Sequence, residues 1–231
     1  MTSIYESGVY LENNPQWHEQ DAPWKVTQIK KMLARNGLSP MRVCDVGCGS
    51  GEILRLLAEE STASATFVGY DISPFAHEIA KRKARDNLGF RLEPLPGASE
   101  QPYDLLLCVD VFEHVEDCFA FLREIKSKAV YKLFHIPLDL SVQTVLRATP
   151  LLQRRASIGH IHYFTKDTAL ATLRDAGYEI TDHFYTHKFC DTPQSGLVDN
   201  VTKWVLSSLF VLNEELAVRI LGCSSLMVLA K

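Results

Sequence analysis

Three glycines at every second position, Gly47, Gly49 and Gly51, stand between an apolar run and a helix-forming segment in "VCDVGCGSGE". Glycine has no side chain, so such a turn brings bare backbone N–H groups close to a ligand. The dinucleotide fingerprint has the spacing G-x-G-x-x-G and holds a pyrophosphate at the helix N-terminus. Here the position of its third glycine is Glu52, whose carboxylate would repel a pyrophosphate. The turn therefore predicts a ligand with less negative charge.

An acidic residue, Asp71, ends the next apolar run about twenty residues after the turn, where a carboxylate can accept hydrogen bonds from ribose hydroxyls. The two features together favour a nucleoside that need not carry a diphosphate. S-adenosylmethionine meets both conditions, since its charges are an ammonium, a carboxylate and a sulfonium. Taken singly, each acid also has a structural explanation. Asp71 could cap the helix that starts at Pro74, and Asp45 could satisfy the amides of the glycine turn.

Three histidines are candidates for a general base, a role that histidine fills because it titrates near neutral pH. They are His114 in "FEHVED", His135 before a proline, and His160 in "GHIHYF", which is the leading candidate. A packing role is the alternative for each of them. His160 and His162 would share one face of an extended segment and could bind a metal. No carboxylate stands at a useful spacing from them, so no metal site is predicted.

Alternating strands and helices must position these residues. Strands are expected at 41–46, 65–72, 90–95, 103–109 and 130–136, and helices at 52–60, from Pro74, and at 115–129. Strands that are apolar on both faces and alternate with helices indicate a parallel sheet covered on both sides. Such sheets bind ligands at the carboxyl ends of their strands. The loops after Val46, Ile72, Val109 and Ile136 should therefore line one cleft.

The rest of the chain is less regular. Helices are expected at 24–33, 167–176, 197–212 and 214–221, and strands at 178–187 and 226–230. The segment 196–221 is rich in Leu, Val, Phe and Trp and could cap an acceptor pocket, form a homodimer interface or pack as core. Its only cations are Lys203 and Arg219, which disfavours a basic membrane-binding face.

The sequence resembles the class I S-adenosylmethionine-dependent methyltransferases. "VCDVGCGSGE", "FVGYDIS" and "YDLLLCVDVFEHVED" are similar to that family's first motif, second motif and fourth strand with its loop. "HIHYFTKDTALATLRDAGYEI" is similar to the helix and strand that follow the fifth strand in many members. The resemblance covers about residues 41–187 and the final "SSLMVLAK". It implies a doubly wound, Rossmann-like α/β sheet of about seven strands, mostly parallel with an antiparallel last strand, and helices on both faces.

The resemblance also implies roles for individual residues. The methionine part of the cofactor is expected to contact Asp45, Gly47, Gly49 and Gly51, and the ribose is expected to contact Asp71. The adenine would pack on Ile72, and Asp110 and Val111 would line the cleft near the adenine and the sulfonium. A segment before the first strand would close over the cofactor, with Trp24 and Lys25 near its methionine end. Many members select adenine with an acid after the third strand. The corresponding region here is broken by prolines, and Glu93 is the candidate.

Composition bounds the remaining possibilities. The 231 residues are 46% hydrophobic, enough for a sizeable core. A net charge of −4 disfavours a nucleic-acid partner. The six cysteines form no close C-x-x-C pair, which favours a reduced cytoplasmic protein without a zinc site. Neither a signal peptide nor an apolar stretch long enough to span a membrane is expected.

The sequence thus predicts a single methyltransferase domain over 1–231. Its parts are an N-terminal helical lid at 1–40, a cofactor-binding core at 41–187, a helical cap at 188–223 and the last strand at 224–231. The expected reaction is methyl transfer from S-adenosylmethionine to an oxygen or nitrogen of a small molecule. The alternatives are a cofactor-binding protein without transferase activity and a nicotinamide-dependent oxidoreductase. The acceptor is not identified by the sequence.

Overall fold

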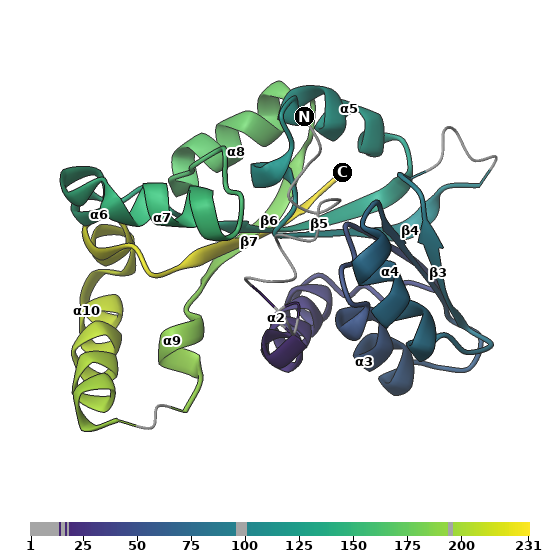
Figure 1. The fold of residues 1–231 in the computed structure, drawn as a ribbon, viewed down its shortest axis with the longest axis horizontal. Helices are drawn as coiled ribbons and strands as arrows, with labels where there is room; N and C mark the ends of the chain where they lie inside the picture. Colours follow the sequence, from purple (N-terminus) through teal and green to yellow (C-terminus); the bar gives the residue numbers. More distant parts are fainter. Residues whose placement is uncertain (1–13, 15–16, 18, 96–100, 194–195) are drawn as a thin grey trace.

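The computed structural model describes residues 14, 17, 19–95, 101–193 and 196–231, which build one seven-stranded sheet flanked by helices (Figure 1). The strands lie in the order β3-β2-β1-β4-β5-β7-β6. They are β1 (Arg42–Val46), β2 (Thr66–Asp71), β3 (Leu88–Leu92), β4 (Tyr103–Val109), β5 (Ala129–Pro137), β6 (Ile180–Thr186) and β7 (Ser225–Ala230). Among the described strands β7 alone runs in the direction opposite to the others. The predicted fold class is confirmed.

Helices cover both faces of the sheet (Figure 1). On one face lie α2 (Ala22–Arg35), α3 (Glu52–Glu60) and α4 (Pro74–Ala80), which bury side chains such as Ile29 and Leu54. On the other lie α5 (Cys118–Lys126) and α8 (Lys166–Asp175), which bury Leu122 and Leu173. Because both faces are covered, the central strands are largely apolar, as Leu105 to Cys108 of β4 illustrate. None of the described helices is both long and apolar enough to cross a membrane.

Local capping sets several boundaries that differ from the sequence prediction. The helix expected at 115–129 begins at Cys118, because the Asp117 side chain accepts a hydrogen bond from the N–H of Ala120. The residues just before it form a separate 3-10 turn, η3 (Phe112–His114). Similar short turns, η1 (Glu19–Asp21) and η2 (Lys81–Lys83), flank α2 and α4.

Three helices were not predicted: α6 (Val142–Arg147), α7 (Thr149–Ser157) and the short α9 (Lys188–Asp191). The α6 helix begins in a capping box between Ser141 and Thr144. The long α10 (Leu197–Leu221) is interrupted at Asn213, whose side chain accepts from the N–H of Leu216 and starts a second helical segment. The predicted division into 197–212 and 214–221 is therefore confirmed.

Lys132 lies in the middle of the sheet, in β5, with only 4% of its surface exposed. Among the described residues it makes no ion pair, and its ammonium lies 5.8 Å from the centre of the Tyr178 ring. Burial, and then the nearby Lys126, lower the pKa of Lys132 to about 8. Charged Lys132 therefore costs folding free energy at neutral pH.

Lys132→Met is expected to stabilise the fold at pH 7 by about 1–3 kcal/mol, since it keeps the length of the side chain and removes the buried charge. The wild-type protein should gain stability as the pH rises from about 8 to 10.5, because the unfolded chain then binds the extra proton. The variant should lack this gain. Urea unfolding at pH 7 and pH 10 measures both effects, and a less stable variant would contradict the assignment.

Candidate active site

A cleft of about 430 Å³ opens at the carboxyl ends of the central strands. As predicted, the loops after β1, β2, β4 and β5 all contribute to it, with Gly47, Ile72, Asp110 and Pro137 among their lining residues. The predicted site residues that line it are Lys25, Asp45, Gly47, Gly49, Asp71, Ile72, Asp110, Val111, His114 and His160. Trp24, Gly51, Glu93 and His135 are not among the lining residues.

The three glycines of the turn serve different purposes. All have positive φ values, +68° at Gly47, +54° at Gly49 and +75° at Gly51. A Cβ on Gly51 would lie 2.4 Å from the Phe90 ring, and one on Gly47 would lie 2.8 Å from Val111. At Gly49 the nearest atom would be 3.7 Å away, on the Trp17 ring, which also lines the cleft. Packing therefore requires two of the glycines, while Gly49 keeps the cleft open.

The Asp71 carboxylate joins the turn to the end of β2. One oxygen accepts the N–H of Gly49 at 2.7 Å, and the other accepts the N–H of Ser73 at 2.8 Å. Burial raises the pKa of Asp71, against the effect of these hydrogen bonds. The helix that starts at Pro74 is capped by Ser73 instead. A carboxylate oxygen has more than one lone pair, so each oxygen of Asp71 can still accept from a ligand hydroxyl.

Asp45 is the buried acid at the bottom of the turn. It is 1% exposed, and among the described residues its Oδ1 has no hydrogen-bond partner. It does not satisfy the turn amides, because Gly47 and Cys48 both donate to the carbonyl of Tyr70. Burial, and then the neighbouring Asp71, raise its pKa well above the usual range. An unpartnered acidic oxygen at a cleft wall favours a ligand that brings a donor or a positive charge.

Glu52 differs from the expectation drawn from the sequence. Its carboxylate lies 2.6 Å from Arg55 and 3.0 Å from Lys83, and these two cations lower its pKa. The repulsion of a pyrophosphate that was expected from Glu52 is thus largely neutralised.

Asp110 follows β4 with a strained φ of +55° and anchors a polar network. Its oxygens lie 2.6 Å from the Lys25 ammonium and 2.6 Å from Nδ1 of His135. Burial alone would raise the pKa of Asp110, but the neighbouring His135 and Lys25 hold this pKa well below its usual range. The other ring nitrogen of His135 lies 3.0 Å from the hydroxyl of Thr186. Both nitrogens of His135 are therefore engaged, which suits it to positioning Asp110 and not to taking a proton from a substrate.

The side chains of Trp24 and Lys25 lie in different parts of the structure. Lys25 enters the cleft, as expected, where it pairs with Asp110. The Trp24 indole packs edge-on against the His135 ring and donates to Asp191 of α9 at 2.9 Å. The aromatic residue that the N-terminal segment adds to the cleft lining is Trp17.

His160 sits at the other wall of the cleft, held by a carboxylate that the sequence did not reveal. Its Nδ1 lies 2.5 Å from Asp139, whose second oxygen lies 2.6 Å from Arg154. Both His160 and Asp139 are buried. A histidine held at one nitrogen by a carboxylate has a fixed tautomer and orientation, and the carboxylate stabilises its protonated form. His162 lies apart and donates to the carbonyl of Val115.

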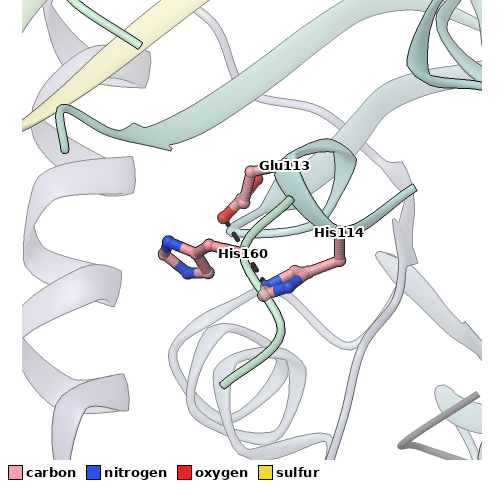
Figure 2. Close-up of side chains that lie close together, drawn as sticks. All are labelled: Glu113, His114 and His160. Atoms are coloured by element: carbon pink, nitrogen blue, oxygen red, sulfur yellow. Dashed lines mark ion pairs between the residues drawn. The ribbon is translucent and has the colours of Figure 1, made fainter. Parts of the chain in front are cut away.

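Glu113, His114 and His160 come together from η3 and from the segment that follows α7 (Figure 2). Glu113 is fully buried, and within the described part of the chain neither of its carboxyl oxygens has a hydrogen-bond partner. Burial, and then the neighbouring Asp110, raise its pKa well above the usual range, which favours the neutral acid. Burial, and then His160, lower the pKa of His114 to about 4. His114 is therefore neutral at pH 7.

These three side chains could also hold a metal ion, since their ligand atoms all lie within 4.8 Å of one another. One carboxylate and two imidazoles are donors that Zn²⁺ and related transition metals accept. No carboxylate stands at a useful sequence spacing from the histidines, but the fold brings Glu113 and Asp139 next to His160. Both acids come from loops that precede the histidine by many residues, so no local spacing reveals them.

The fold and the cleft are those of a class I S-adenosylmethionine-dependent methyltransferase. The features that define this class here are the strand order, the single antiparallel strand β7 and the glycine turn that is hydrogen-bonded to Asp71. A family model described as "Methyltransferase domain" matches residues 17–183, and the chain belongs to this family. The predicted resemblance, the enzyme class and the cofactor S-adenosylmethionine are thereby confirmed.

Individual relatives agree with this assignment. The chain is 29% identical to "Ubiquinone biosynthesis O-methyltransferase" of Xanthomonas euvesicatoria over 72% of this chain and 77% of the relative. A chain of the complex between the Trm112 methyltransferase activator of Haloferax volcanii and a methyltransferase is similar at a TM-score of 0.69 and 16% identity, covering 100% of this chain and 98% of that one. Magnesium protoporphyrin IX methyltransferase of Synechocystis, with bound S-adenosylhomocysteine, is similar at a TM-score of 0.56 and 19% identity, covering 93% and 82%. The two structural likenesses show the shared fold.

Proposed function

We propose that this methyltransferase transfers a methyl group to a hydroxyl oxygen of a small, ring-bearing molecule, with His160 as the general base. The observation that carries the proposal is the hydrogen-bonded His160–Asp139 pair in the wall of the cleft. A base is needed only when the acceptor must lose a proton, as a hydroxyl does. The relative from Xanthomonas is named a ubiquinone biosynthesis O-methyltransferase, and this similarity supports oxygen as the atom that is methylated.

The cleft suits S-adenosylmethionine in its shape and charge. The open side of Gly49 leaves room for the methionine part, and Asp45 offers an unpartnered oxygen to its ammonium. Asp71 would accept from the ribose hydroxyls, and Ile72, which is 53% exposed, would pack against the adenine. Asp110 and Val111 would line the side nearest the sulfonium. When bound, the cofactor supplies a methyl group on a positively charged sulfur.

The protein's own part in the reaction is orientation and proton removal. The free ring nitrogen of His160 would take the proton of the acceptor hydroxyl as the oxygen–methyl bond forms and the sulfur–methyl bond breaks. Asp139 fixes the tautomer of His160 and stabilises the imidazolium, while Arg154 keeps Asp139 in place. Holding the acceptor oxygen in line with the methyl group supplies much of the barrier reduction, on the order of 7 kcal/mol in favourable cases.

A metal-assisted reaction is the second candidate, favoured by the unpartnered buried carboxyl of Glu113 beside His114 and His160. In that case His160 would be a ligand and not a base. The ion would polarise the acceptor oxygen and lower the pKa of its hydroxyl.

We further propose that α2 acts as the lid over the cofactor. Ala22 and Lys25 of this helix line the cleft. Trp24 and Gln28 of α2 contact Asp191, and Asp21, just before the helix, pairs with Lys188, so the start of α2 is tied to α9. Closing this helix over the cleft would exclude water during transfer.

Two measurements test the proposed function. Calorimetric titration should show micromolar binding of S-adenosylmethionine and S-adenosylhomocysteine and none of NAD. Transfer of a labelled methyl group should then be assayed with dihydric phenols, carboxylic acids and amines in parallel. Methylation of the phenols alone supports the proposal. Methylation of an amine alone would overturn the oxygen assignment, and cofactor binding without transfer to any acceptor class would favour a binding protein.

A further inference from the structure

An unusually apolar surface is shared by α6, α7 and α10, at the end of the molecule opposite β3 and α4 (Figure 1). Helices α6 and α10 contact one another directly. Leu146 is 81% exposed, Leu152 65%, Trp204 78%, Val211 87% and Leu212 81%. Monomeric proteins rarely expose many large apolar side chains close together, so the exposed residues at this end of the molecule indicate a contact surface.

Helix periodicity shows that this surface is a true face of α10 and not a scatter of exposed residues. With 3.6 residues per turn, Leu206 and Phe210 lie on one side of the first helical segment, and both are buried. The opposite side holds Val201, Trp204 and Val211, which are exposed together with Val198, Val205 and Leu212. Ser208 is the polar residue on that side. The segment also carries polar residues, among them Asp199, Asn200 and Lys203, but it packs through Leu206 and Phe210 and leaves most of its apolar side chains uncovered.

Positive charge accompanies the apolar surface. No acid occurs from residue 140 to residue 166, although the whole chain carries a net charge of −4. Arg154 and Lys166 of this stretch are paired with Asp139 and Glu215. Arg147 and Arg155 are exposed at the ends of α6 and α7, and neither has an ion-pair partner among the described residues. Two uncompensated arginines therefore flank Val145, Leu146 and Leu152.

We propose that the face formed by α6, α7 and the first segment of α10 docks on an anionic lipid bilayer. Exposed aliphatic side chains can enter the boundary between headgroups and acyl chains, and an exposed tryptophan suits that boundary because it is apolar with one polar N–H. Arginines at the rim would pair with lipid phosphates. A second copy of this chain fits less well, because each face would carry Arg147 and Arg155 against Asp199 as the exposed acid of its described residues, so two faces with the same net charge would meet.

The expectation that 196–221 lacks a basic membrane-binding face was drawn from α10 alone. The structure places α6 against α10, with α7 following α6, so the positive charges come from a segment some fifty residues earlier in the chain. The same segment leads directly into Ile158 and His160, which line the cleft. A bilayer on this face would therefore lie next to the wall that holds the base, where an apolar acceptor could enter from the lipid.

Vesicle sedimentation tests the proposal with the full-length protein. Vesicles of phosphatidylcholine alone and vesicles with about one-third phosphatidylglycerol should be compared at low and high salt, since surface attraction is screened by ions. We expect the protein to sediment with the anionic vesicles only, and less at high salt. The double variant Arg147→Glu/Arg155→Glu and the single variant Trp204→Ser should each bind at least tenfold more weakly.

A matched control carries the same charge change elsewhere. Arg82→Glu/Arg91→Glu replaces two exposed arginines near α4 and β3, at the other end of the molecule. It should bind the anionic vesicles as the wild type does. Equal loss in the control would show non-specific attraction and overturn the proposal. So would an absence of vesicle binding, or a stable dimer in light scattering that Trp204→Ser dissolves, which would assign the face to a second copy.

Discussion

Gly49→Asp is expected to weaken S-adenosylmethionine binding by at least a hundredfold, about 2.7 kcal/mol, while the fold survives. The side chain would project into the cleft, where the only atom near its Cβ is on the Trp17 ring, 3.7 Å away. It would occupy the space for the methionine part and add a negative charge beside Asp45 and Asp71. Aspartate tolerates the positive φ of this position better than most residues do. Calorimetric titration measures the affinity, and thermal unfolding reports the fold.

Gly37→Asp is the matched control for this prediction. Gly37 has a similar backbone angle, φ +62°, and a Cβ there would meet no atom within 4 Å. It follows the end of α2 and is not among the residues that line the cleft. Both variants should lose a similar amount of stability, on the order of 1 kcal/mol, from the left-handed conformation. If Gly49→Asp retains full affinity, the cofactor binds elsewhere, and the roles proposed for Asp45 and Asp71 are wrong as well.

The cofactor half of the cleft could be predicted because its determinants are local in sequence. A glycine turn follows one buried strand directly, and an acid ends the next strand. Because neighbouring parallel strands end at the same edge of the sheet, these two features must lie close together. The strand Tyr103–Val109 and the helix Glu52–Glu60 have the predicted bounds for the same reason. Even so, the sequence could not distinguish Gly49, which keeps the cleft open, from Gly51, which the packing of Phe90 requires.

The acceptor half could not be predicted in the same way, because its contacts join distant segments. Asp139 lies 21 residues before His160, and nothing in "PLDL" distinguishes it from an ordinary loop acid. Helices α6 and α7 were not predicted from the sequence because α7 buries no side chain and α6 buries only Thr144. Without a buried apolar stripe, the usual periodic signal of a helix is absent. The same exposure is what makes their surface a candidate for lipid contact.

His160→Ala is expected to lower kcat by a factor of about 10² to 10⁴ while leaving the affinity for S-adenosylmethionine unchanged. Removal of the imidazole takes away the proton acceptor but leaves Asp139 paired with Arg154, so the loop should keep its structure. His162→Ala is the control, since His162 contacts the carbonyl of Val115 and is not among the cleft-lining residues. Steady-state kinetics and calorimetry separate the two effects. Unchanged turnover in His160→Ala would assign His160 a structural role.

Glu113→Gln decides whether His160 acts as a base or as a metal ligand. Burial raises the pKa of Glu113 and so favours its neutral form, which glutamine matches in charge and size. If His160 is the base, turnover should change by only a few fold, and dialysis against a chelator should have no effect. If the cluster holds a metal, Glu113→Gln, His160→Ala and the chelator should abolish turnover alike, because each removes the ion from the same three ligands. Glu113, whose carboxyl oxygens have no hydrogen-bond partner among the described residues, is therefore the group whose replacement separates the two mechanisms.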